Sequence, residues 1–81
     1  MTNDAAFTDE QLQRMRPPAA AKRIRRSLGL SQEDFSIRYH IPLRTLQEWE
    51  QGRREPDAAA LAYLKVIEKE PLTTARALAA E

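Results

Sequence analysis

The chain has 81 residues and carries 13 basic and 12 acidic side chains, for a formal net charge of +1. A chain of this length forms one domain, and its core supplies only about 3–5 kcal/mol, so a partner or a second copy is expected to add stability. The lack of cysteine excludes disulfides and thiolate metal sites, and no apolar run reaches the ~18 residues that span a bilayer, so we expect a cytoplasmic protein with no membrane partner.

The small net charge hides an uneven distribution along the chain. Residues 14–54 carry ten Lys and Arg against four acids, a local charge of +6, whereas residues 1–13 sum to −3 and residues 55–81 to −2. Positive charge of this size attracts a phosphate backbone, although a solvated basic face also explains such clusters. Charge alone therefore leaves both interpretations open.

The chain predicts an all-α fold of four to five short helices. It has only two glycines and no alternating apolar segment of strand length. The first predicted helix runs from about Asp9 to Met15, because Thr8 and Gln11 form a capping-box pattern, and Pro17-Pro18 ends it. We assign it to an N-terminal extension, residues 1–17.

The second predicted helix runs from Pro18 or Ala19 to Leu28. Proline is tolerated in a first helical turn, and Gly29 suits the left-handed conformation that follows a last turn. Ile24 and Leu28 are four residues apart, so we expect them to face the core.

The third predicted helix spans residues 32–39. Ser31 is the expected N-cap, and Asp34 stands where it completes an approximate capping box. His40 lies where this helix must end, two residues before Pro42, and His is among the residue types enriched at positive φ.

Pro42 is expected to open the next helix, from about Pro42 to Gln51, because a proline at the first helical position loses no hydrogen bond. Leu46 and Trp49 share one face of this helix, and Gly52 marks its end. Trp49 is interpreted as a core residue and not as a platform for base stacking.

Two more helices are predicted in the remainder of the chain. One starts at Pro56-Asp57 and ends at Pro71, with an expected apolar stripe of Ala60, Leu61, Leu64 and Ile67 or Glu68. The other spans residues 72–80, and the sequence names no core partner for it, so fraying and contact between chains both stay open.

Two short helices joined by about three residues must cross steeply, and the apolar residues between them fix the crossing. The predicted core of this motif is Phe35, Ser36, Tyr39, Ile41, Leu46 and Trp49, with Ser36 as the small residue at the closest approach. The pattern predicts a helix-turn-helix whose second helix has a free outer face: Leu43, Arg44, Gln47 and Glu48.

Three stretches resemble the phage-repressor-like (XRE) helix-turn-helix family: Ser31-Gln32-Glu33-Asp34-Phe35, Thr45-Leu46 with the earlier Ile41, and Trp49-Glu50-Gln51-Gly52-Arg53. The resemblance covers residues 22–70, without a gap between 31 and 52, and implies a lambda-repressor-like domain over residues 18–70 followed by a C-terminal helix in 71–81. The stretch from Ile41 to Asp57 is also similar to HigA-type antitoxins.

The resemblance implies a transcriptional repressor that binds double-stranded DNA, at a palindromic operator, as a homodimer. Gln32 would donate to a phosphate or a neighbouring base, and Arg44 and Leu43 would contact guanine and a thymine methyl in the major groove. Arg53 and Arg54 would hold backbone phosphates. The full implied set is Gln32, Leu43, Arg44, Gln47, Glu48, Arg53 and Arg54, with Arg25 and Glu50 as a structural ion pair.

Three residues depart from the family pattern. His40 replaces a glycine of the turn, and Pro42 replaces a hydroxyl residue that caps the recognition helix. Glu48 places an acid on the outer face, where it would accept from cytosine or repel phosphate.

No nucleophile–base constellation is present, and His40 is the only histidine in a sequence without cysteine. We therefore expect no enzyme, metal or cofactor.

Three functions remain open at this point. The protein is expected to be the autoregulating antitoxin of a toxin–antitoxin module, with a toxin protein as a further partner. The alternatives are a stand-alone repressor and an interaction module that only neutralises a toxin.

Overall fold

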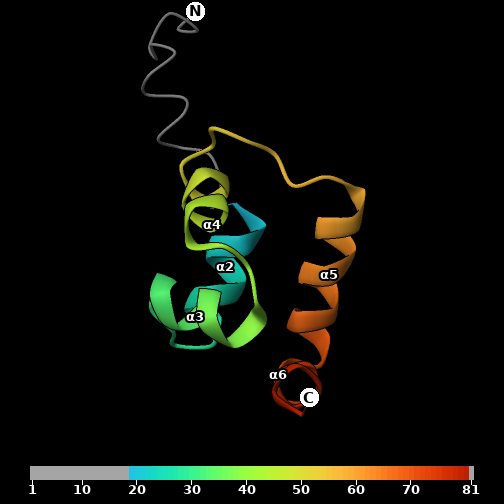
Figure 1. The fold of residues 1–81 in the computed structure, drawn as a ribbon. Coiled ribbons are helices and arrows are strands. Elements are labelled where there is room, and N and C mark those ends of the chain that lie inside the picture. Colours follow the sequence, from blue (N-terminus) through green and yellow to red (C-terminus); the bar gives the residue numbers. More distant parts are fainter. Residues whose placement is uncertain (1–18, 81) are drawn as a thin grey trace, which may run out of the picture.

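Five helices follow one another in the computed structural model, which describes residues 19–80: α2 (Ala20–Ser27), α3 (Gln32–Tyr39), α4 (Leu43–Glu50), α5 (Ala58–Lys69) and α6 (Pro71–Ala79). Figure 1 shows α2, α3 and α4 gathered on one side and α5 upright on the other, with α6 across its lower end. The fold is all-α. The helix predicted from Asp9 to Met15 lies outside the described residues.

Local capping signals set the limits of α3. The backbone amide of Asp34 donates to Ser31 Oγ at 3.0 Å, which begins the helix at the predicted residue. His40 ends it with φ 57° and ψ 39°, the left-handed conformation expected from the sequence. Gly29 after α2 and Gly52 after α4 have φ of 71° and 75°, so all three predicted stops are confirmed.

The prediction that Pro42 is the first residue of its helix is wrong by one position. Pro42 has ψ 136°, outside the helical range, while its carbonyl accepts from the Leu46 amide at 3.0 Å. Those two properties define an N-cap. The helix therefore runs from Leu43 to Glu50, and Gln51 is its C-cap.

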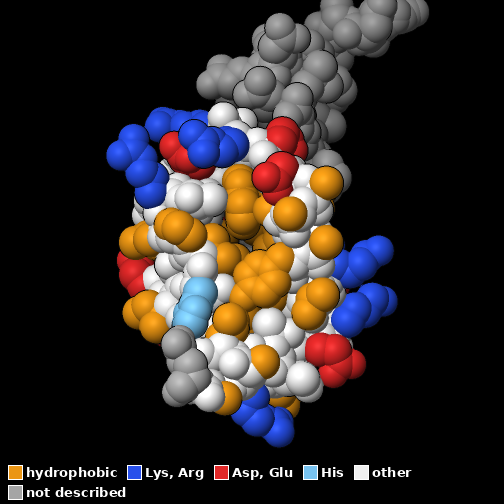
Figure 2. Space-filling view, turned by 45° about the vertical axis from the view of Figure 1, so that its right-hand side comes forward, with side chains coloured by type: hydrophobic (Ala, Val, Ile, Leu, Met, Phe, Trp, Pro, Cys, Tyr) orange, Lys and Arg blue, Asp and Glu red, His pale blue; other side chains and the backbone are white. Residues whose placement is uncertain are grey.

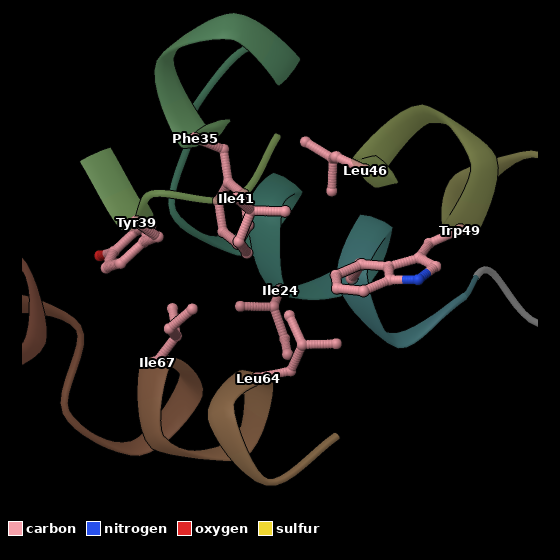
Figure 3. Close-up of a cluster of buried hydrophobic side chains, with 9 residues drawn as sticks. Ile24, Phe35, Tyr39, Ile41, Leu46, Trp49, Leu64 and Ile67 are labelled. Atoms are coloured by element: carbon pink, nitrogen blue, oxygen red, sulfur yellow. The ribbon is translucent and has the colours of Figure 1, made fainter. Parts of the chain in front are cut away.

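The core lies where α2, α3, α4 and α5 meet, and Figure 3 shows their apolar side chains pointing toward one another. The rings of Phe35 and Tyr39 lie with centroids 5.0 Å apart and tilted by 51°. Within residues 19–80, nine apolar residues are at most 8% exposed: Ala21, Ile24, Phe35, Tyr39, Ile41, Leu46, Trp49, Leu64 and Ile67. These include the five apolar residues that the sequence placed in the motif core.

The apolar stripe predicted for the α5 segment is only partly correct. Leu64 and Ile67 are buried, whereas Leu61 is 49% exposed and Glu68 is exposed. Each helical residue advances about 100° around the axis, so Leu61, three residues before Leu64 but six before Ile67, falls on the flank of the buried stripe. Ala60 supplies the inward position at the start of the helix.

The last helix has a core partner that the sequence did not name. Ala75 and Leu78 of α6 pack against the buried cluster, and the Tyr39 hydroxyl donates to the Pro71 carbonyl at 3.0 Å. The Tyr63 hydroxyl of α5 donates to the Tyr39 carbonyl at 2.6 Å. These bonds tie α6 and α5 to the end of α3.

None of the helices described within residues 19–80 has the length and apolarity needed to cross a membrane.

Candidate nucleic-acid interface

The turn between α3 and α4 is closed by two hydrogen bonds between the same two residues. The Ile41 amide donates to the Ser36 carbonyl at 3.1 Å, and the Ser36 hydroxyl donates back to the Ile41 carbonyl. His40 lies between them in the left-handed conformation, which reverses the chain. The hydroxyl of Ser36 therefore satisfies a backbone carbonyl of the turn.

The two faces of α4 have opposite character. Leu46 and Trp49 point into the core, at 0% and 8% exposure. On the other side the Arg44 side chain is 89% exposed, and Leu43 and Gln47 are half-buried. The buried face fixes the helix while its outer face stays open to a ligand.

Glu48 does not stand free on that outer face, contrary to the expectation from the sequence. Its side chain is only 25% exposed, and its two carboxylate oxygens face two different arginines. One oxygen lies 3.7 Å from Arg44 Nε and the other 3.5 Å from Arg54 Nε. The second contact depends on the backbone path after Gly52, which local sequence rules do not give.

Arg53 and Arg54 are exposed and follow directly after the end of α4. Their backbone amides donate to the Glu48 carbonyl at 2.9 and 3.4 Å, which folds this segment back against the helix. Figure 2 shows basic side chains gathered at the upper left of the face drawn there, with acidic side chains among them. The positive charge of the segment is thus presented next to the outer face of α4.

A largely buried polar network supports α4 from the inside. Arg25 of α2 donates to both carboxylate oxygens of Glu50, from Nε at 2.7 Å and from an Nη at 2.9 Å, and its other Nη donates to the Leu30 carbonyl at 2.9 Å. The Glu50 side chain is only 3% exposed. Arg25 and Glu50 thus join α2 to the end of α4.

The electrostatics of this network keep both partners charged. Burial alone would raise the pKa of the Glu50 carboxyl, but hydrogen bonds from Arg25 and Gln32 and the positive charge of Arg25 bring that pKa below its usual value. The hydrogen bond to Glu50 in turn raises the pKa of the Arg25 guanidinium.

Gln32 is the first residue of α3, and its side chain turns toward the network. Its Nε2 donates to Glu50 Oε1 at 3.0 Å. An amide nitrogen has two hydrogens, so one is committed to Glu50 and the other is left for a further acceptor. The sequence predicts that Gln32 donates to a phosphate or a neighbouring base, and it does not reveal this internal contact with Glu50.

The helix-turn-helix family model matches residues 22–62, from α2 into α5. The crystal structure of an HTH XRE-family like protein from Agrobacterium tumefaciens is similar, with a TM-score of 0.74 and 61% sequence identity over 76% of this chain and 98% of that chain. This chain belongs to the XRE-type helix-turn-helix family. Proteins of this family are DNA-binding regulators.

Among curated proteins, the chain is similar to Antitoxin HigA-2 of Vibrio cholerae serotype O1. The two are 38% identical over 50 residues, which is 62% of this chain and 48% of the antitoxin. The chain therefore spans about half the length of this curated relative.

Proposed function

We propose that this protein is a sequence-specific transcriptional repressor that binds a palindromic operator as a homodimer. The observation that carries the proposal is the two-faced α4, with Leu46 and Trp49 buried and the Arg44 side chain 89% exposed on the opposite side. Family membership supports the use of that exposed face in the major groove.

Three residues of α4 are proposed to contact base edges. Arg44 has the planar guanidinium that pairs with guanine O6 and N7, and it lies near the start of the helix, where a recognition helix is closest to the bases. Leu43 offers an apolar contact to a thymine methyl, and Gln47 lies one turn further along the same face.

Phosphate contacts are proposed for residues on either side of that face. The remaining amide hydrogen of Gln32 and the exposed guanidinium groups of Arg53 and Arg54 would hold the backbone. These contacts set affinity and register but carry no sequence information, and they make binding sensitive to salt. In a homodimer the two α4 helices would lie about one helical turn, ~34 Å, apart.

A gel-shift experiment with the full chain and the DNA upstream of its own gene tests this function. We expect a shift at low salt that persists at higher salt only for the upstream fragment and not for an unrelated duplex. Equal affinity for both duplexes at both salt concentrations would contradict sequence-specific recognition.

The finer proposal is that the repressor is the autoregulating antitoxin of a toxin–antitoxin module. It is supported by the similarity to Antitoxin HigA-2 and by exposed apolar side chains outside α4, including Ile37 at 73% and Leu72 at 68%, which suit a protein partner.

Co-expression with the product of the adjacent gene, followed by co-purification, tests the antitoxin proposal. A stable complex that still binds the operator is the expected result. No complex would leave a stand-alone repressor, and a complex without operator binding would leave an interaction module that only neutralises a toxin.

A further inference from the structure

We infer that Glu48 is an internal competitor of DNA: its carboxylate holds the guanidinium groups of Arg44 and Arg54 in the free protein and must release them when DNA binds. The inference rests on the proposed DNA-binding function and adds a residue that limits affinity through two others.

The position of Glu48 is well defined within the fold. It lies in the last turn of α4, its side chain is 25% exposed, and its backbone carbonyl accepts from the amides of Arg53 and Arg54. The Glu48 carboxylate therefore lies between Arg44 on the outer face of the helix and Arg54 in the basic segment that follows it. The two arginine side chains are much more exposed than Glu48, at 89% for Arg44 and 66% for Arg54.

The two ion pairs are long and weak enough for DNA to replace the Glu48 carboxylate as the partner of each arginine. At 3.7 and 3.5 Å they are longer than a charge-assisted hydrogen bond, which is about 2.7–2.9 Å, and each carboxylate oxygen serves a different arginine. Exposed pairs of this kind are weak. A phosphate or a guanine edge can accept two short hydrogen bonds from one guanidinium, in a bidentate arrangement. DNA can therefore displace the Glu48 carboxylate from the arginines.

Releasing the two arginines from Glu48 reduces the binding free energy of the wild-type protein on every duplex, whatever its sequence. Both ion pairs are lost, and the released carboxylate is left close to DNA, where it offsets part of the charge that the arginines bring. Removing the charge of Glu48 should therefore strengthen binding and make it more sensitive to salt.

Glu48→Gln is the direct test because it keeps the side-chain shape and removes only the charge. Its matched control is Glu55→Gln, which makes the same charge change in the exposed segment after Arg54, where the described residues give Glu55 no ion pair. On the operator at ~0.1 M salt we expect Glu48→Gln to bind about 3- to 10-fold tighter than Glu55→Gln, with a salt slope steeper by about one unit.

A double-mutant cycle separates release of the arginines from simple repulsion between Glu48 and phosphate. Arg53 and Arg54 are neighbours of equal charge, but only Arg54 pairs with Glu48. The gain from Glu48→Gln should persist in an Arg53→Ala background and fall by at least half in an Arg54→Ala background. Urea unfolding of each variant identifies any change that comes from misfolding.

Three results would overturn the inference alone: no gain over Glu55→Gln, an equal gain in the Arg53→Ala and Arg54→Ala backgrounds, or weaker operator binding by Glu48→Gln, which would make the carboxylate a base acceptor. If the wild-type chain bound no duplex even at low salt, the proposed function and this inference would fail together.

Discussion

Arg25 of α2 and Glu50 at the end of α4 meet in a two-pronged ion pair, with N–O distances of 2.7 and 2.9 Å and side chains only 14% and 3% exposed. This pair ties α2 to α4, the helix proposed to enter the DNA groove. The orientation of the outer face of α4 therefore depends on a contact on its inner side.

Arg25→Met should strongly destabilise the fold. The Glu50 carboxylate would stay buried without its counter-ion, and breaking a buried pair from one side costs about 3 kcal/mol. For a chain whose core supplies only about 3–5 kcal/mol this is a large fraction. The control is Arg23→Met, which breaks the exposed pair with Glu68, at 55% and 39% exposure. Urea unfolding measures both, and equal losses would contradict the account.

Acid should weaken the fold through Glu50. Its pKa in the folded state lies below the ordinary value of 4.5, so its stabilisation is complete above pH 4.5 and is lost as the pH falls through the folded-state pKa. The free energy of unfolding, followed from pH 7 to pH 3, should decline below 4.5. Glu50→Gln should remove part of that decline and Glu55→Gln should not. The same decline in all three proteins would refute this assignment.

His40 carries backbone strain that glycine would relieve. It is exposed and has φ 57°, a conformation that costs an L-residue about 1–2 kcal/mol. His40→Gly should therefore raise the free energy of unfolding by about 0.5–1 kcal/mol after the greater entropy of an unfolded glycine is subtracted. His40→Ala removes the imidazole but keeps the strain. A glycine variant no more stable than the alanine variant would be inconsistent with strain at this residue.

The hydroxyl of Tyr39 should hold α6 on the domain. Tyr39→Phe removes its hydrogen bond to the Pro71 carbonyl, with an expected cost of about 1 kcal/mol. Amide hydrogen exchange in α6 should accelerate in this variant. Tyr63→Phe, which loses the bond to the Tyr39 carbonyl but keeps the one to Pro71, is the comparison. Unchanged protection of α6 in Tyr39→Phe would show that apolar contacts alone hold the helix.

The parts of the fold that the sequence predicted well are those set by local backbone chemistry. Ser31 as N-cap, the left-handed His40, and glycines at 29 and 52 each depend on a few adjacent residues. The alternation of core and surface positions in α3 and α4 follows from helical spacing in the same way. Pro42 lies one position earlier than predicted, at the N-cap, because the preference of proline for a helix start does not fix the boundary to within one residue.

The parts that escaped prediction depend on residues far apart in the chain. Leu61 matched the composition of a core stripe, but which flank of α5 is buried follows from where α2 lies. The contacts of Gln32 with Glu50, of Glu48 with Arg54 and of Tyr39 with Pro71 require the folded path of the chain. The polar contacts around the candidate site were therefore harder to predict from the sequence than the buried apolar residues that hold its helices together.

The central claim is that the outer face of α4 contacts DNA bases, and Arg44 tests it most directly. Affinities should be measured for the wild type, Arg44→Ala and Arg76→Ala, on the operator and on operators with single base-pair changes. Arg76→Ala removes an equal charge from an exposed position of α6. We predict that Arg44→Ala loses about 1–3 kcal/mol at one base pair and no longer discriminates there, while Arg76→Ala matches the wild type. Operator binding by Arg44→Ala with unchanged affinity and unchanged discrimination would contradict the account.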